Sequence, residues 1–302
     1  MALSVAVTGS TGLVGGALAG ALGSAGHRVV RVVRGDTAAA GDGAVRWDPD
    51  FGTIEASRLD GVDAVVHLSG ESIARGRWTE AKKQRIRSSR VRSTIFLADT
   101  LARLPRPPRA LVAASATGYY GSRGDQVLRE ESVSGTGFLA DVCREWEAAT
   151  APAAHRGVRV VHLRTGVVLT PAGGALRTLL WPFRLGLGGP VGPGTQWMSW
   201  ISIDDLCGAI LHALATESLA GPVNAVAPAP VTNREFATTL GRVLGRPAFL
   251  RLPAFAVHLL LGEMADELLL ASTRAVPARL EATGFAFGDP ALEGALRRLL
   301  SR

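Results

Sequence analysis

The short segment SATGYYG, residues 115–121, brings together Ser115, Thr117 and the only two tyrosines of the sequence, Tyr119 and Tyr120. Hydroxyl groups of this kind can give a proton to a carbonyl oxygen, or take one from an alcohol, while hydride moves at the adjoining carbon. The segment is equally consistent with the polar end of a buried strand, in which the tyrosines pack as an aromatic pair. The chemical interpretation therefore requires a redox cofactor beside these hydroxyls.

A glycine-rich segment near the N-terminus predicts such a cofactor. In VAVTGSTGLVGGAL, residues 5–18, Gly9, Gly12 and Gly15 lie between an apolar strand and a helix. The first glycine permits a sharp turn, the second lets the backbone approach a pyrophosphate, and the third lets the helix pack closely on the strand. The anion would then be bound by the free N–H groups at the helix start. The spacing in this context indicates a dinucleotide site, and the alternative is a glycine-rich turn without a ligand.

The second strand-like segment, HRVVRVVRG, predicts which dinucleotide binds. An acidic residue at the end of this strand accepts from the ribose 2′-hydroxyl of NAD, whereas an arginine suits the 2′-phosphate of NADP. The strand ends at Arg34, with Arg31 three residues earlier, and a guanidinium forms paired, charge-assisted hydrogen bonds with phosphate oxygens. We therefore expect NADP. Asp36, just beyond the strand, could favour NAD instead or serve only as a turn residue.

Alternating strand-like and helix-like segments predict an α/β fold: a doubly wound parallel Rossmann sheet with a smaller, mainly helical C-terminal domain. We assign residues 1–230 to the NADP-binding domain and residues 231–302 to the small domain, which would cover the substrate. Residues 170–200, rich in glycine and proline, would add a short helix and loops to the substrate cleft. The expected strands span 3–9, 27–35, 44–49, 62–70, 109–115, 158–169 and 221–227, and the clearest helices span 12–26, 137–151 and a long stretch ending near 103.

Composition excludes several classes of protein. The 302 residues, 47% hydrophobic and 20% charged, are typical of a folded globular protein. No apolar run approaches the roughly 20 residues of a membrane helix, and the N-terminus resembles no signal peptide, so we expect a cytoplasmic protein. Cys143 and Cys207 predict neither a disulfide framework nor a metal site. The net charge of +7 comes mainly from scattered arginines, which we interpret as solvated helix faces and cofactor contacts rather than a nucleic-acid surface.

With these features in place, the chain resembles the extended or atypical short-chain dehydrogenase/reductase family, and within it the epimerase-like branch that has its own small C-terminal domain. The resemblance runs along the whole chain. It is carried by the segments VTGSTGLVGGAL, RWDP, HLSGESI, RWTEAKKQRIRSSRVRST, SATGYYG, WEAA, RTGVVL, PFRLGLGGPVGPGTQWMSWISIDDL and VNAVAPAPVTNREFATTLGRVLGRP. It implies a Rossmann core, NADP binding and a cytosolic location.

The resemblance also implies a set of cofactor contacts. By position these fall at Gly9, Thr11, Gly12, Leu13, Gly15, Arg34, Leu68, Ser69, Gly70 and Arg90, with Arg85 and Val168 in addition. Three polar residues near this set keep two interpretations each. His67 could be a core residue or a ligand, Asp48 could stabilise a turn or approach the adenine, and Arg90 could face the cofactor or solvent.

The catalytic residues that the family implies are only half present. Ser115 lies where the family has its catalytic serine. The partner motif, Tyr-x-x-x-Lys, cannot exist here, because all tyrosines are at 119 and 120 and all lysines at 82 and 83. Three explanations stay open: Tyr119 or Tyr120 supplies the proton, a residue of the 170–200 segment does so, or the protein binds NADP and senses redox state with little catalysis.

The segment PFRLGLGGPVGPGTQWMSW suggests the substrate side of the site. Arg184, Gln196, Trp197 and Trp200 combine apolar walls with a few polar anchors, as ligand clefts do. The alternative is a structural loop whose tryptophans fill a domain interface. We thus expect an NADP-dependent oxidoreductase or epimerase-like enzyme with a small carbonyl or hydroxyl substrate, or else an NADP(H)-binding regulator. We expect no metal, no nucleic acid and no membrane partner, and leave homodimer formation open.

Overall fold

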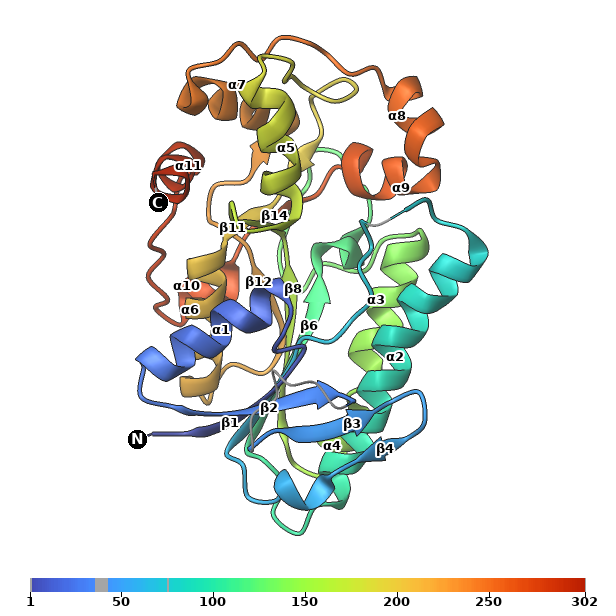
Figure 1. The fold of residues 1–302 in the computed structure, drawn as a ribbon, viewed down its shortest axis with the longest axis vertical. Helices are drawn as coiled ribbons and strands as arrows, with labels where there is room; N and C mark the ends of the chain where they lie inside the picture. The colour runs from blue at the N-terminus through green and yellow to red at the C-terminus, as the bar shows by residue number, and fades with distance from the viewer. Residues whose placement is uncertain (1, 36–42, 75, 302) are drawn as a thin grey trace.

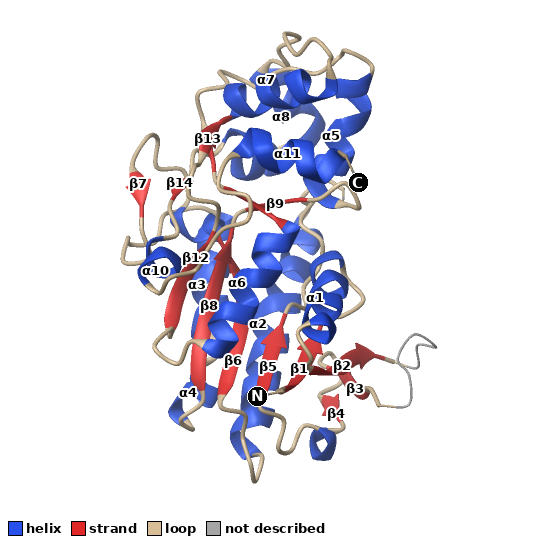
Figure 2. Cartoon of the chain, turned by 90° about the vertical axis from the view of Figure 1, so that its left-hand side faces the viewer, coloured by secondary structure: helices blue, strands red, loops and turns tan. Residues whose placement is uncertain are grey.

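The computed structural model describes residues 2–35, 43–74 and 76–301. Its centre is an eight-stranded sheet in the order β12-β8-β6-β5-β1-β2-β3-β4 (Figures 1 and 2). Neighbouring strands run parallel except for β3 and β4 at one edge. The strands are β1 (Ser4–Thr8), β2 (Arg28–Arg34), β3 (Val45–Asp48), β4 (Thr53–Ile54), β5 (Ala64–His67), β6 (Ala110–Ala116), β8 (Arg159–Thr165) and β12 (Gly221–Ala225). The predicted doubly wound sheet is confirmed.

Helices cover both faces of this sheet because its strands are apolar on both sides. On one face Leu18 and Ile210 pack against Val5, and on the other Leu97 packs against Val65. The first layer contains α1 (Leu13–Ser24) and α6 (Ile203–Ala215), and the second contains α2 (Glu80–Arg103), α3 (Phe138–Ala148), α4 (Ala151–His155) and the short η2 (Ala56–Arg58). The sheet is therefore buried, and its ligand-accessible region is the edge where the strands end.

A second, mainly helical lobe lies beyond the carboxyl ends of the strands (Figure 1). Its core joins Leu180, Phe236 and Leu296 from three helices that are far apart in sequence. The elements of this lobe are α5 (Gly174–Arg184), α7 (Asn233–Leu244), α8 (Ala254–Leu261), α9 (Glu263–Ala265), η4 (Asp266–Leu270) and α11 (Leu292–Leu300), with α10 (Ala278–Ala282) returning beside β12. Because α5 belongs to this core, the two lobes are not contiguous halves of the sequence.

Short strand pairs connect the lobes. They are β7 (Val127–Leu128) with β14 (Arg274–Ala275), β9 (Val167–Leu169) with β11 (Trp200–Ser202), and β10 (Trp197–Met198) with β13 (Val231–Thr232). The predicted strand over 158–169 is thus two strands. At Gly166 the chain leaves the central sheet and passes the Ser199 carbonyl so closely that a Cβ would lie 2.6 Å from its oxygen.

Two glycines of α1 give a matched test of how tightly this helix packs on β1. A Cβ on Gly15 would lie 2.2 Å from the Gly9 carbonyl oxygen, whereas one on Gly20 would meet nothing within 4 Å. We expect Gly15→Ala to lower the free energy of unfolding by about 2 kcal/mol or more through overpacking. Gly20→Ala should raise it by up to about 1 kcal/mol, because alanine favours a helix. Urea denaturation of both variants tests this, and equal effects would contradict the packing.

Candidate functional site

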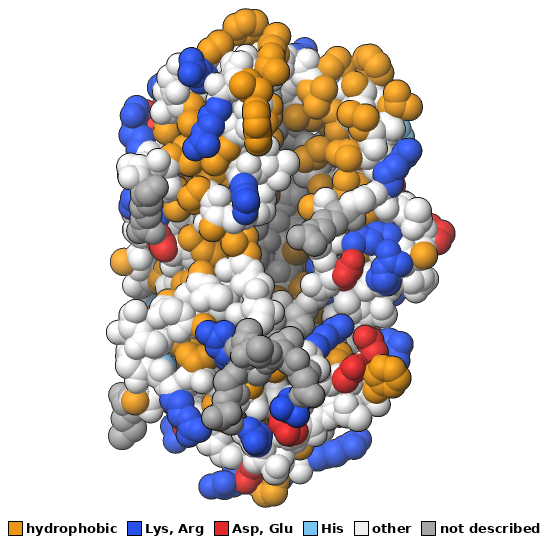
Figure 3. All heavy atoms as spheres, viewed as in Figure 1, with side chains coloured by type: hydrophobic (Ala, Val, Ile, Leu, Met, Phe, Trp, Pro, Cys, Tyr) orange, Lys and Arg blue, Asp and Glu red, His pale blue; other side chains and the backbone are white. Residues whose placement is uncertain are grey.

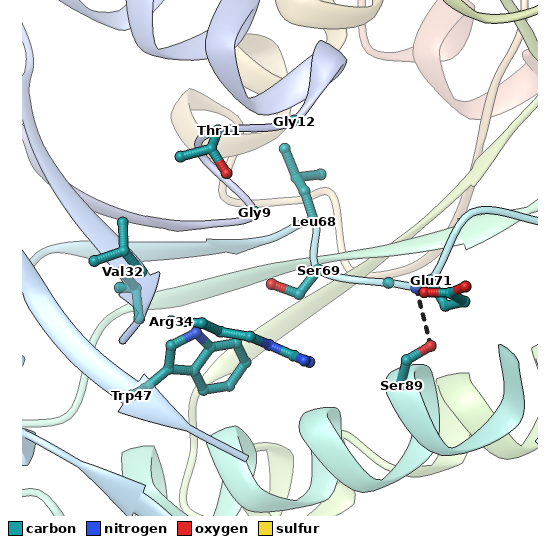
Figure 4. Close-up of a pocket in the computed structure, with 12 residues that line it drawn as sticks. Gly9, Thr11, Gly12, Val32, Arg34, Trp47, Leu68, Ser69, Glu71 and Ser89 are labelled. Carbon is teal, nitrogen blue, oxygen red and sulfur yellow. Dashed lines mark hydrogen bonds between the residues drawn. The ribbon is translucent and has the colours of Figure 1, made fainter. Parts of the chain in front are cut away.

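A cavity of about 450 Å³ opens where β1, β2 and β5 end (Figure 4). It lies beside the junction of β1 and α1, the place where open α/β sheets bind ligands. Seven of the ten residues predicted to contact the cofactor line it, and Leu13, Gly15 and Arg90 do not. The lining consists of Gly9, Thr11, Gly12, Val32, Val33, Arg34, Trp47, Leu68, Ser69, Gly70, Glu71 and Ser89.

The glycine loop has the geometry that phosphate binding needs. Gly9 has a φ of +66°, and a Cβ there would lie 2.8 Å from the Leu68 carbonyl oxygen. Gly12 is the N-cap of α1, and no side chain accepts from the N–H groups of the first turn. The Ser10 hydroxyl is buried without a hydrogen-bond partner. The free backbone and hydroxyl donors, together with the lack of side chains at Gly9 and Gly12, fit a bound pyrophosphate.

Arg34 closes the opposite end of the cavity. It is the last residue of β2, and Figure 4 shows its side chain directed into the cavity. Its ion pair with Asp50, at 3.5 Å, joins two exposed side chains and is therefore weak. The guanidinium thus keeps most of its hydrogen-bonding capacity for a ligand. Asp36, the residue that could favour NAD, lies outside the described residues.

Two polar residues near the cavity have hydrogen-bond partners inside the protein. His67 is fully buried, with Nδ1 2.7 Å from the Thr8 hydroxyl and Nε2 3.0 Å from the Thr94 hydroxyl. Burial, followed by the Arg34 charge, lowers the pKa of His67 from 6.5 to about 4. Asp48 accepts from the backbone N–H of Asp50 at 2.9 Å and stabilises a turn.

Leu13 and Arg90 lie close to the site without lining the cavity. The Leu13 side chain lies against Gly173, at the start of α5. Arg90 donates to the Glu71 carbonyl at 3.0 Å and stacks on Trp146, with its guanidinium carbon 5.1 Å from the ring centroid. Burial lowers the pKa of Arg90. Its guanidinium also lies against Gly70, so it shapes the edge of the cavity.

The hydroxyl segment lies beside this cavity, on the next strand. The register of β5 with β6 pairs His67 with Ala113, so Ser115 falls level with Ser69. The Ser115 hydroxyl donates to Glu147 Oε1 at 2.7 Å. The same carboxylate accepts from Arg164 Nε at 2.8 Å and, through Oε2, from its Nη2 at 2.9 Å. The proton of Ser115 is therefore committed to a buried, bidentate ion pair.

The two tyrosines differ in accessibility. Tyr120 is fully buried, donates to Asn224 Oδ1 at 2.6 Å and accepts from Arg164 Nη1 at 3.0 Å. Burial raises the pKa of Tyr120 to about 12. Tyr119 is only half-buried, and the Arg164 guanidinium carbon lies 3.4 Å from its ring centroid. Of the two, Tyr119 alone has a side chain that solvent or a ligand can contact.

Helix α3 carries apolar residues where the family has its Tyr-x-x-x-Lys pair. When this helix is aligned with the family motif at Glu147, Leu139 falls at the tyrosine position and Cys143 at the lysine position. Both side chains lie against Gly118. Cys143 is buried, and burial raises the pKa of its thiol to about 12, so it is a core residue and not a nucleophile. The helix thus faces the hydroxyl segment with apolar groups.

Sequence reasoning missed Arg164 and the bonding role of Glu147. Arg164 lies near the end of the strand VRVVHLRTG, where an arginine among apolar residues predicts a buried partner. The sequence therefore indicates a buried partner for Arg164. It does not indicate which residue that partner is, because Glu147 lies on helix α3 and Asn224 lies on β12, the strand next to β8.

The predicted substrate residues lie in different environments. Trp200 is fully buried, and its Nε1 donates to the Ala229 carbonyl at 2.9 Å, so it belongs to the core of the smaller lobe. Gln196 is buried as well and donates to the carbonyls of Val191 and Leu269. Both side chains therefore have partners inside the fold, although the buried Oε1 of Gln196 has no hydrogen-bond partner among the described residues. Arg184 is exposed at the end of α5, and Trp197 stacks under Arg274.

Other kinds of site find no support in the described part of the chain. Residues 2–35, 43–74 and 76–301 contain no group of three or more histidine, cysteine, aspartate or glutamate side chains arranged to hold a metal ion. Within the same residues, no helix is both long and apolar enough to cross a membrane.

The fold and the cavity define the class of protein. The chain belongs to the NAD dependent epimerase/dehydratase family, whose model matches residues 5–225. Residues 252–299 match a second model, described as a domain of unknown function, DUF1731.

Individual relatives resemble the chain over almost its whole length. Epimerase family protein Mb2239 of Mycobacterium bovis is 48% identical, over 94% of this chain and 93% of that protein. Epimerase family protein SDR39U1 of Homo sapiens is 39% identical, over 99% of this chain and 100% of that protein.

Solved structures extend the comparison. The crystal structure of human SDR39U1 (isoform2) with NADPH matches with a TM-score of 0.90 at 38% identity and covers 99% of each chain. A nucleoside-diphosphate sugar epimerase from Corynebacterium glutamicum matches with a TM-score of 0.81 at 40% identity, over 99% of this chain and 58% of that one. Both share the family fold with the present chain.

The buried His67 predicts a loss of stability in acid. An unfolded chain protonates this imidazole below its ordinary pKa of 6.5, and the folded chain only below about 4. Its contribution is therefore fully present above pH 6.5 and is lost as the pH falls towards 4, by roughly 3 kcal/mol in all. Urea denaturation of the wild type and of His67→Asn at several pH values measures this. The variant should lose less stability between about pH 7 and about pH 5, and identical slopes would contradict the assignment.

Proposed function

We propose that the protein is an NADP-dependent oxidoreductase or epimerase-like enzyme that acts on a small carbonyl or hydroxyl substrate. The observation that carries this proposal is the cavity with a glycine cradle at one end and the Arg34 guanidinium at the other. The human relative crystallised with NADPH supports the choice of cofactor. Gly9, Thr11 and Gly12 would hold the pyrophosphate, and Arg34 the 2′-phosphate.

The register of the sheet supports the placement of the chemistry. A dinucleotide that spans the strand ends from Arg34 past Gly9 continues towards Ser69 and its neighbour Ser115. When bound, the nicotinamide exchanges a hydride with the carbon of a carbonyl or alcohol. The protein must then hold the substrate oxygen and move its proton.

We assign the proton transfer to Tyr119. Tyr119 is the tyrosine of the pair whose side chain is only half-buried, and its ring lies on the Arg164 guanidinium. Arg164 would thus orient the Tyr119 ring, and it is itself held in position by the carboxylate of Glu147. Ser115 would position the substrate oxygen or the carboxylate rather than donate its proton.

One observation favours the alternative, an NADP(H)-binding regulator with little catalysis. Two of the three groups predicted to be catalytic are used inside the fold: Ser115 donates to Glu147, and Tyr120 is buried. If Tyr119 also serves only packing, the protein binds the dinucleotide without turnover. The predictions below separate cofactor binding from catalysis.

The cofactor assignment predicts a clear preference for NADPH over NADH. Removing the guanidinium in Arg34→Ala deletes charge-assisted hydrogen bonds worth roughly 1.5–3 kcal/mol, so NADPH should bind about 10- to 150-fold more weakly. Affinity for NADH should stay within about twofold, because NADH lacks the 2′-phosphate. Isothermal titration calorimetry with both nucleotides measures this. Arg31→Ala is the matched control, since Arg31 lies on the same strand outside the cavity lining. Equal affinities of the wild type for both nucleotides would refute the assignment.

The proton-transfer assignment predicts that the two tyrosines respond differently. In a metabolite screen that follows NADPH absorbance, Tyr119→Phe should lower kcat by roughly 10²- to 10⁴-fold, the usual contribution of a general acid or base. Tyr120→Phe should keep kcat within about tenfold and lower the free energy of unfolding by about 1–3 kcal/mol, because Asn224 and Arg164 lose a buried partner. If Tyr119→Phe turns over normally, the tyrosine is not the donor. If no metabolite oxidises NADPH although NADPH binds, the regulator is favoured.

A further inference from the structure

The smaller lobe exposes an unusual amount of apolar side chain. Three aromatic side chains protrude furthest: Trp181 is 71% exposed, Phe249 74% and Phe255 75%. The exposed large apolar residues in two segments, 181–187 and 249–269, are Trp181, Leu185, Leu187, Phe249, Leu250, Leu252, Phe255, Leu259, Leu260 and Leu269. We call these residues the apolar surface. Contiguous surfaces of this kind on soluble proteins mark places that bind a partner.

The two segments form one surface because they are hydrogen-bonded to each other. The backbone N–H of Leu250 donates to the Gly188 carbonyl at 3.2 Å, and that of Leu252 donates to the Pro190 carbonyl at 2.9 Å. Helix α8 begins two residues later, at Ala254. Figure 3 shows the hydrophobic side chains gathered at this end of the molecule, on both sides of a hollow.

Helix α8 exposes apolar side chains on most of its surface. Its sequence, AFAVHLLL, is apolar almost all round, yet Val257 is its only buried residue. Phe255 and Leu259, one turn apart, are 75% and 73% exposed. A helix that is apolar on every side is normally buried in a core or in lipid.

Exposed arginines border the apolar surface. Arg184 and Arg246 are exposed, and neither has an ion-pair partner among the residues that the structure describes. Arg251 donates to the carbonyl of Gly192. Of the nearby carboxylates, Glu263 is paired with Lys83 at 3.0 Å, and Asp266 lies 3.1 Å from His258, which is charged only when it is protonated.

We propose that the apolar surface docks on the face of an anionic lipid bilayer. Aromatic and leucine side chains bordered by arginines are the combination that inserts into the headgroup region of such a membrane. A second copy of the chain fits less well, because a two-fold interface sets the same patch against itself. Such an interface would gather the arginines of both copies in one contact region without adding a patch of opposite charge. Docking of this kind needs no spanning helix and would bring the hollow towards ligands held in the membrane.

Vesicle co-sedimentation of the full chain tests the proposal. We expect the protein to pellet with vesicles of equal parts phosphatidylglycerol and phosphatidylcholine, and much less with pure phosphatidylcholine. The double variant Phe255→Ser/Leu259→Ser should remove binding. The double variant Arg184→Gln/Arg246→Gln should weaken it roughly tenfold or more, since each arginine near an anionic surface contributes to attraction. Added salt should also weaken vesicle binding by the wild type, because salt screens the attraction between arginines and anionic lipids.

Phe51→Ser is the matched control. Phe51 is 84% exposed in the turn after β3, at the far end of the molecule, so its loss should leave vesicle binding unchanged. Circular dichroism and calorimetric NADPH binding verify that every variant is folded. Failure to bind vesicles overturns the proposal whether or not NADPH binds. A different result would favour a second copy of the chain. In that case the protein would self-associate with rising concentration, Phe255→Ser/Leu259→Ser would abolish the self-association, and vesicles would not be bound.

Discussion

Helix α1 starts so close to strand β1 that no side chain fits between them, and the position of the candidate site depends on this contact. A Cβ on Gly15 would lie 2.2 Å from the Gly9 carbonyl oxygen, so only glycine permits the approach. The approach brings the uncapped first turn of α1 to the edge of the sheet, level with the ends of β2 and β5. Free N–H donors, the Arg34 guanidinium and the edge of β5 consequently border one cavity. Loosening this junction would separate groups that come from three parts of the chain.

A second constraint is the buried ion pair of Arg164 and Glu147. Burying two charges is costly unless both are fully hydrogen-bonded, and here the guanidinium satisfies the carboxylate bidentately and also contacts Tyr120. The pair joins β8 to α3 and holds the hydroxyl segment at the end of β6. It also places a positive charge against Tyr119. Stability and the proposed chemistry therefore depend on the same side chains.

The two lobes present different surfaces. Backbone donors and a guanidinium border the cavity at the sheet, whereas the smaller lobe exposes aromatic and leucine side chains next to arginines. Glu267 links the lobes by accepting from the backbone N–H groups of Phe138 and Leu139 at the start of α3.

The sequence by itself determined the strands, the helices of the sheet layers and the glycine cradle. These follow from local rules: apolar runs, glycine spacing and the position of Arg34 at a strand end act over a few neighbouring residues. Only the tertiary structure decided the roles of Arg164, Glu147, Tyr120 and Trp200. Each depends on partners far away in sequence, such as Asn224 for Tyr120 and Ala229 for Trp200. The same holds for the division into lobes, because α5 shares a core with α7 and α11, which are far from it in sequence. Burial and hydrogen bonding between distant segments are set by how the layers assemble, and local patterns carry no information about that assembly.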